Sequence, residues 1–133
     1  MWSKLANYRD VALLFLRLSL GSFFIYVHGW PKLAGGLPKW KALGGAMKYV
    51  GITFWPVFWG FMAAFSESIC VALLIIGFAF RPSCLLLTIT MSVAAVSVYR
   101  SRGLGEASHA IELALVFAAL MFIGAGKYSV DKS

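Results

Sequence analysis

The sequence predicts an all-α integral membrane protein: an antiparallel four-helix bundle with a short interfacial helix between the first and second spans. Three observations support this prediction. The 133 residues are 61% hydrophobic with a mean hydropathy of +0.83, whereas soluble domains are roughly 45–50% apolar. The apolar residues form four segments close to the ~20 residues that a bilayer requires, which is too long and continuous for barrel strands. Short connections between the segments favour one antiparallel bundle.

The first span is expected at about residues 11–30, after a basic amino terminus. That terminus has the charge of a signal peptide, but Arg17 interrupts the apolar run and no small-residue cleavage site follows before His28. We therefore expect a retained first span. In residues 38–49, lysine alternates with apolar and aromatic side chains, which predicts a short helix at the membrane interface.

The remaining spans have recognisable boundaries, and they are expected at about residues 56–80, 83–99 and 107–125. Pro56 suits the first turn of a helix, where its missing N–H does no harm. Arg81 and Pro82 predict a tight hairpin between the second and third spans. Residues 101–108 read as a loop, and glycines end the fourth span before a polar tail.

The formal net charge of +7 comes mostly from lysines and arginines in short loops, where anionic lipid headgroups attract them. No basic patch carries a nucleic-acid motif, so we expect a lipid bilayer and not a nucleic acid as the partner. Basic residues are almost evenly divided between the two membrane sides, which leaves the orientation open. Cys70 and Cys84 belong to no CxxC or CxxCH motif, and inert buried thiols are favoured over a disulfide.

Two charges are expected near the middle of the membrane. Arg17 lies six residues into the first span, and Glu67 lies eleven residues into the second, which runs in the opposite direction. Both therefore come to a similar depth. Because each charge within a span costs about 2.5–3.5 kcal/mol or more, we predict that Arg17 and Glu67 pair. The pair either locks two helices together or forms part of a ligand site.

A second polar group is expected at one mouth of the bundle. His28 ends the first span, while His109 and Glu112 begin the fourth and share one helix face. Lys32 borders the same side. Histidine exchanges protons near neutral pH, so the three residues could form a protonation site, although each alone is more simply an interfacial residue. A haem between the histidines or a zinc ion is less favoured, because no metal-ligand motif is present.

Motifs along the chain resemble those of the DoxX family of small four-helix membrane proteins. The segment LLFLRLSLGSFFIYVHGWPKL resembles the family's opening pattern. Its matching positions are Arg17, Gly21, His28, Gly29 and Lys32. Glu67 stands where the family carries an acidic residue in helix two, and Gly77 with Arg81 matches the exit from that helix.

The closing segment IELALVFAALMFIGAGKYSVD resembles the family's final pattern, with Ala125 in place of proline and Lys127 in place of arginine. The family name comes from a subunit of a thiosulfate:quinone oxidoreductase. Other members resemble accessory proteins of redox and stress-response systems, and distant eukaryotic relatives act in membrane-protein trafficking or assembly. The resemblance implies the four-helix fold, and it carries over no catalytic residues.

We therefore expect a membrane subunit of a quinone-interacting redox system that binds a quinone or similar apolar ligand in a bundle pocket. Phe23, Phe24 and Tyr26 would wall a flat slot. The candidate catalytic residues, which would supply protons, are His28, Glu112 and His109. The candidate ligand-binding residues are Arg17, Phe24, Lys32 and Glu67.

Electrons would come from a redox partner protein or an unseen cofactor, because the chain has no haem-attachment, CxxC or dinucleotide motif. The alternative is a non-catalytic membrane partner or assembly protein that binds another membrane protein or lipid. Its glycine and alanine content suits close helix contacts, within the chain or in a homo-oligomer. In either case we expect a bacterial cytoplasmic membrane protein.

Overall fold

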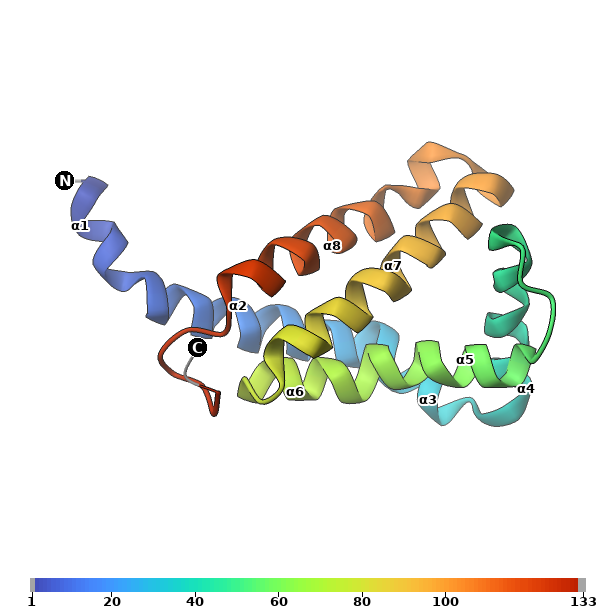
Figure 1. Ribbon diagram of the computed structural model, residues 1–133, viewed down its shortest axis with the longest axis horizontal. Coiled ribbons are helices and arrows are strands. Elements are labelled where there is room, and N and C mark those ends of the chain that lie inside the picture. The colour runs from blue at the N-terminus through green and yellow to red at the C-terminus, as the bar shows by residue number, and fades with distance from the viewer. Residues whose placement is uncertain (1, 132–133) are drawn as a thin grey trace.

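The computed structural model describes residues 2–131, which are helical almost throughout and contain no strand (Figure 1). Four stretches are long and apolar enough to cross a membrane: Ser3–Ala34, Pro56–Ile76, Phe80–Arg102 and Leu104–Ile123. The predicted all-α class with four spans is therefore confirmed. In Figure 1 the direction of the chain reverses from each span to the next.

The first span is longer than the predicted residues 11–30, because its helix begins near the amino terminus and continues to Ala34. It consists of five consecutive helical pieces: α1 (Trp2–Leu5), the 3-10 turn η1 (Ala6–Tyr8), α2 (Arg9–Phe24), the π-helical η2 (Ile25–Gly29) and α3 (Trp30–Ala34). Lys32 thus belongs to the end of the first span instead of the loop that follows it.

The segment between the first two spans is helical, as predicted. It contains α4 (Gly36–Gly44) and the 3-10 helix η3 (Gly45–Val50), and its position at a membrane interface remains a prediction. Two glycines let α4 lie directly against the second span. A Cβ on Gly44 would collide with the carbonyl of Pro56, and one on Gly60 would collide with that of Trp40.

The second span comprises α5 (Pro56–Phe65), the π-helical η4 (Ser66–Cys70) and α6 (Val71–Ile76). The predicted hairpin at Arg81-Pro82 is wrong. The chain turns earlier, at Gly77, which has a φ of 76°, and α7 (Phe80–Arg102) already includes both residues. Pro82 lies in the first turn of α7, where a helix does not use its backbone N–H.

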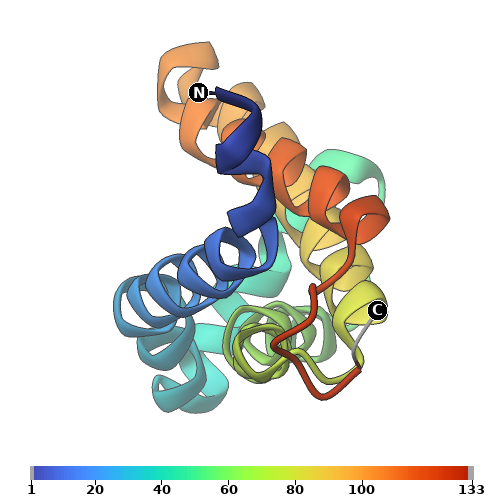
Figure 2. The same cartoon turned by 90° about the vertical axis from the view of Figure 1, so that its left-hand side faces the viewer.

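The predicted loop over residues 101–108 is also wrong. Only Gly103, with a φ of 95°, separates α7 from α8 (Leu104–Ile123). The two helices pack along their length (Figures 1 and 2). Cys70 and Cys84 are both buried and free, which confirms the expectation of buried thiols without a disulfide between them.

The predicted Arg17–Glu67 pair is wrong, because Arg17 binds backbone carbonyls instead. Its side chain is 2% exposed. The guanidinium donates to the carbonyl of Ile75 at 2.9 Å, to that of Ala125 at 2.9 Å and to that of Tyr128 at 2.9 Å. Ile75 lies eight residues beyond Glu67, about 12 Å further along a helix. Arg17 therefore lies closer than Glu67 to the end of the bundle that holds the chain termini.

The carboxyl-terminal tail folds back to complete this end of the bundle (Figure 2). Asp131 accepts hydrogen bonds from the backbone N–H groups of Ala79 at 3.1 Å and Phe80 at 2.8 Å. Asp10 accepts one from the backbone N–H of Lys127 at 3.0 Å. We call Arg17, Asp10, Asp131 and residues 124–131 the tail clasp. It joins the first span, the turn between the second and third spans, and the end of the fourth.

Candidate functional site

The two π-helical segments bring the candidate residues together. His28 lies in η2 and Glu67 lies in η4. The segments are in close contact, since a Cβ on Gly29 would collide with the carbonyl of Glu67. Short π segments within α-helices are uncommon and are frequent at functional sites. Because two π segments lie beside each other on neighbouring spans, we take this region of the bundle as the candidate functional site.

Lys32, and not Arg17, is the partner of Glu67. The ammonium Nζ lies 2.5 Å from Oε2 of the carboxylate, with side chains that are 24% and 3% exposed. This is the one salt bridge among the described residues. Burying an unpaired carboxylate would cost several kcal/mol, and the ammonium group of Lys32 offsets that cost for Glu67. The backbone carbonyl of Lys32 also accepts a hydrogen bond from Trp40 Nε1 at 3.0 Å, which ties α3 to α4.

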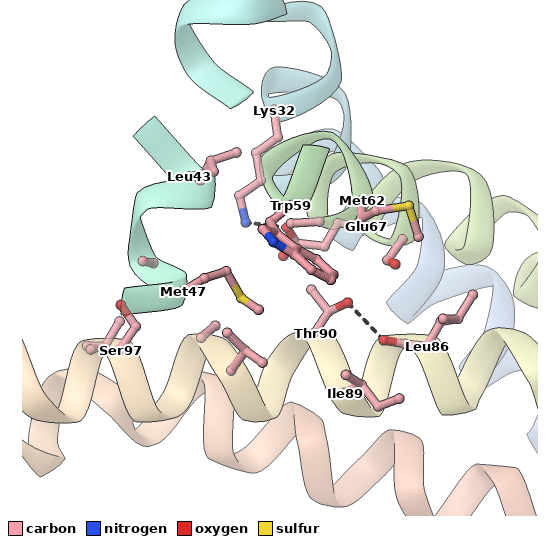
Figure 3. Close-up of a pocket in the computed structure, with 16 residues that line it drawn as sticks. Lys32, Leu43, Met47, Trp59, Met62, Glu67, Leu86, Ile89, Thr90 and Ser97 are labelled. Atoms are coloured by element: carbon pink, nitrogen blue, oxygen red, sulfur yellow. Dashed lines mark hydrogen bonds and ion pairs between the residues drawn. The ribbon is translucent and has the colours of Figure 1, made fainter. Parts of the chain in front are cut away.

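A cavity of about 400 Å³, which we call the main pocket, lies beside this ion pair, between α5, α7 and the α4–η3 segment (Figure 3). Its wall is mostly aliphatic and thioether in character. The larger apolar side chains that line it are Leu43, Met47, Met62, Leu86, Ile89 and Val93. In Figure 3 Lys32, Trp59 and Glu67 lie together across the pocket from the α7 residues.

Trp59 contributes the main pocket's unsatisfied donor. Its indole Nε1 is buried and has no hydrogen-bond partner among the described residues. Leaving a buried donor unpaired costs about 1–3 kcal/mol, and buried indole N–H groups usually find a partner. An acceptor on a ligand in the main pocket would relieve this cost.

A second cavity of about 160 Å³, which we call the histidine pocket, also borders the ion pair. His28, His109, Phe24, Met91 and Glu106 are among its lining residues. The two pockets share a wall, whose residues are Lys32, Glu67, Ala94 and Val98. The ion pair is therefore the polar part of a partition between an apolar chamber and a polar one.

The two histidines form a direct contact between the first and fourth spans. Their Nε2 atoms lie 3.2 Å apart, and their ring centroids are separated by 5.0 Å. Phe24 packs against the His28 ring at a centroid distance of 5.0 Å and meets Phe117 edge-on. His109 is exposed and His28 is half-buried. In a hydrogen bond between the two rings, one Nε2 donates and the other accepts. Because one ring is exposed and the other half-buried, this contact links the surface of the bundle to its interior.

Comparison with known proteins identifies the family. A family model described as DoxX matches residues 12–100. The chain belongs to the DoxX family. Searches of curated proteins and of solved structures gave no match. The matched region of this DoxX protein includes Arg17, His28, Lys32 and Glu67, and it ends before His109 and the tail.

The DoxX chain brings together five of the predicted site residues, namely Phe24, His28, Lys32, Glu67 and His109. Arg17 belongs to the tail clasp instead. Glu112 is exposed and lines neither pocket. The predicted slot walls are wrong for Phe23 and Tyr26, which are 65% and 82% exposed and face outward.

Sequence reasoning missed the main pocket and the donor at Trp59. Tryptophans at the start of a span, such as Trp55 and Trp59, are typical of an aromatic belt at the membrane surface, an environment that Trp55, 67% exposed, fits better than Trp59. The spacing of Trp55 and Trp59 on one helix gave no means of separating the two. Within the described residues, no group of three or more His, Cys, Asp and Glu side chains is placed to hold a metal ion.

Proposed function

We propose that this DoxX protein binds a quinone, or a similar flat apolar ligand with a carbonyl oxygen, in the main pocket. It would act as a membrane subunit of a quinone-linked redox system in a bacterial cytoplasmic membrane. The observation that carries the proposal is the buried indole N–H of Trp59, unpartnered among residues 2–131, on the wall of an apolar cavity. The origin of the family name in a quinone-reducing complex agrees with it.

The shape and lining of the main pocket support an apolar ligand. Its volume of about 400 Å³ lies within the roughly 300–1,000 Å³ of small-molecule sites, which combine an apolar wall with a few placed polar groups. Met47 and Met62 line opposite parts of this wall. Thioether side chains adapt to irregular shapes and contact aromatic rings favourably, which suits a ring-shaped headgroup.

The polar groups of the pocket support a ligand that accepts hydrogen bonds. Trp59 offers a donor only, and the Lys32 ammonium has three donors, of which Glu67 takes one. A quinone carbonyl has no hydrogen to donate and matches these groups.

Electrons have to reach the ligand from outside this chain. The sequence has no haem-attachment or dinucleotide motif, so a redox partner protein is the proposed source. The DoxX chain then holds the quinone and controls access to its polar end, while the partner carries out electron transfer.

Equilibrium dialysis of the detergent-purified protein against a short-tail ubiquinone tests this proposal. We expect saturable binding by the wild type. Trp59→Phe should bind about tenfold more weakly, because it loses one hydrogen bond of about 1–1.5 kcal/mol. Ala63→Trp should abolish binding, because Ala63 lines the main pocket and the indole would fill it.

The matched control is Ala119→Trp, which makes the same change at an exposed position of α8. It should bind the quinone like the wild type. Equal uptake by wild type, Ala63→Trp and Ala119→Trp would mean that the quinone only partitions into the detergent. That result would overturn the proposal and favour the alternative of a non-catalytic partner for another membrane protein or lipid.

A further inference from the structure

The histidine pocket is placed to serve the main pocket. The two chambers share lining residues, and the Lys32–Glu67 pair is the polar part of that shared wall. Any proton that passes between the chambers along polar groups must cross this pair. The neighbouring wall residues, Ala94 and Val98, offer no polar side chain.

Five titratable groups line the histidine pocket, and they come from four different helical segments. They are His28 from η2, Lys32 from α3, Glu67 from η4, and Glu106 with His109 from α8. The third span contributes only apolar side chains to this pocket, Met91 among them. The exposure of these groups falls from Glu106 and His109, which are exposed, through half-buried His28 to buried Glu67.

The contacts among these groups are suitable for proton transfer. The Nε2 atoms of His109 and His28 are 3.2 Å apart, within hydrogen-bond distance. The cavity of about 160 Å³ between the rings and the ion pair has room for several water molecules, each of which occupies about 30 Å³ in the liquid. Polar groups surround that space, as bound water requires.

We propose that the His28–His109 pair carries protons between the surface of the bundle and the ligand in the main pocket, with Lys32–Glu67 as the relay in the shared wall. This inference rests on the proposed quinone site. When the bound quinol is oxidised by a one-electron acceptor such as ferricyanide, two O–H bonds break, two electrons pass to two acceptor ions and two protons are released; reduction of the quinone by the redox partner protein takes up two electrons and two protons by the same steps in reverse. The hydroxyl that faces the ion pair gives its proton to the Glu67 carboxylate. That proton then passes through the water of the histidine pocket to His28, to His109 and to solution.

Stopped-flow oxidation of the quinol-loaded protein by ferricyanide tests the route. Two ferricyanide ions each take one electron without binding a proton, so a pH dye in weak buffer reports only the protons of the quinol. The variants are His28→Gln and His109→Gln, which keep hydrogen-bonding capacity but do not exchange protons near neutral pH. Ser108→Ala, at the exposed neighbour of His109 in α8, is the matched control.

We expect one of the two protons to be released about 100-fold more slowly in either histidine variant, since positioned acid–base groups contribute roughly 10²–10⁴-fold. Added imidazole should restore the rate, and Ser108→Ala should release both protons like the wild type. Unchanged release in the histidine variants would overturn the relay. Slow release that imidazole does not restore would also overturn it, because it would assign the histidines a structural role.

Dialysis of the same variants with the short-tail ubiquinone separates this inference from the proposed function. Absence of quinone binding in the wild type removes the ligand site itself. Normal binding with unchanged proton release leaves the ligand site intact and rejects only the proposed relay.

Discussion

The two ends of this bundle differ in how completely their buried polar groups are hydrogen-bonded. In the tail clasp, Arg17 is 2% exposed and its guanidinium is hydrogen-bonded to the carbonyls of three residues. At the cavity end, Lys32 is partly exposed, pairs with one carboxylate and borders two pockets, while the neighbouring N–H of Trp59 has no partner among residues 2–131. The polar groups of the tail clasp are thus fully bonded within the protein, and those at the cavity end keep hydrogen-bonding capacity that the proposed function assigns to a ligand.

The chemistry of the two cations fits this division. Arginine presents five N–H donors in a fixed planar fork, which suits several carbonyls held in fixed positions. Lysine carries a compact ammonium on a flexible stem with three donors. The Lys32 head can therefore change partners between Glu67 and a ligand without disturbing the backbone, whereas Arg17 cannot leave its carbonyls without releasing the tail.

The largest expected effect comes from Arg17→Met. It should lower the free energy of unfolding by on the order of 5 kcal/mol, because one buried and two partly buried carbonyls lose their donor at about 1–3 kcal/mol each. SDS titration in mixed micelles measures this change, and limited proteolysis detects release of the tail. Arg81→Met, which removes an exposed arginine from α7, is the control. Similar small effects in both variants would contradict a structural role for Arg17.

A double-mutant cycle at the cavity end should give the next largest effect. Lys32→Met leaves Glu67 buried and unpaired and should cost about 3 kcal/mol. Adding Glu67→Gln should recover about 1–2 kcal/mol of this loss, because contacting residues couple by about 0.5–3 kcal/mol. The same SDS titration measures all three variants. Strict additivity of the two changes would show that the ion pair does not form in the membrane protein.

The two ends should be independent of each other. Combining Arg17→Met with Glu67→Gln should give the sum of the single effects within about 0.5 kcal/mol, because the two side chains share no partner. Unfolding free energies of the single and double variants measure whether the two effects are additive. A coupling well above this value would restore the Arg17–Glu67 pair that the depth of the two residues in the sequence predicts.

Asp131→Asn should cost about 1 kcal/mol, as expected for a weakened helix cap. The carboxylate accepts the N–H groups of Ala79 and Phe80 at the start of α7. The thermal unfolding midpoint measures the loss. Glu112→Gln, which neutralises an exposed carboxylate outside both polar clusters, should leave the midpoint unchanged, and an equal fall in both variants would rule out a specific cap.

The smallest expected effect is a gain in stability from Ala79→Gly. Ala79 has a φ of 48°, a left-handed conformation that costs alanine roughly 1–2 kcal/mol and glycine very little. The unfolding free energy should rise by about 1 kcal/mol. Ala119→Gly, the same change within α8, should instead lower it by about 0.5–1 kcal/mol. A loss at both positions would mean that the strain at Ala79 is absent.

The sequence predicts the spans and the convergence of His28, His109 and Lys32, because both follow from hydropathy and topology, but it pairs Glu67 with Arg17 instead of Lys32. The partners of Arg17 were missed because they are backbone carbonyls, which no residue type announces. The depth estimate failed because it began the first span at residue 11, whereas the helix begins near residue 2. That difference changes which residues of the first two spans lie side by side.

The main pocket was missed for a different reason. Its α7 wall consists of residues such as Leu86, Ile89 and Val93, which are the same types that face lipid elsewhere in the bundle. The two π segments also escaped notice, since residues 25–29 and 66–70 carry no pattern that distinguishes them from α-helix. Both features depend on how the helices pack, which composition and periodicity do not describe.

The π segments also limit how this protein can change in length. Removing one residue from η2 would tighten it to an ordinary α turn, because a π segment holds one more residue per turn than an α-helix. The residues beyond it, Lys32 included, would keep nearly the same positions around the helix axis, whereas the same deletion from a regular α-helix rotates everything beyond it by about 100°. A one-residue deletion within η2 is therefore expected to disturb mainly His28, which lies inside it, and a deletion in the α-helical turns before it is expected to displace both His28 and Lys32.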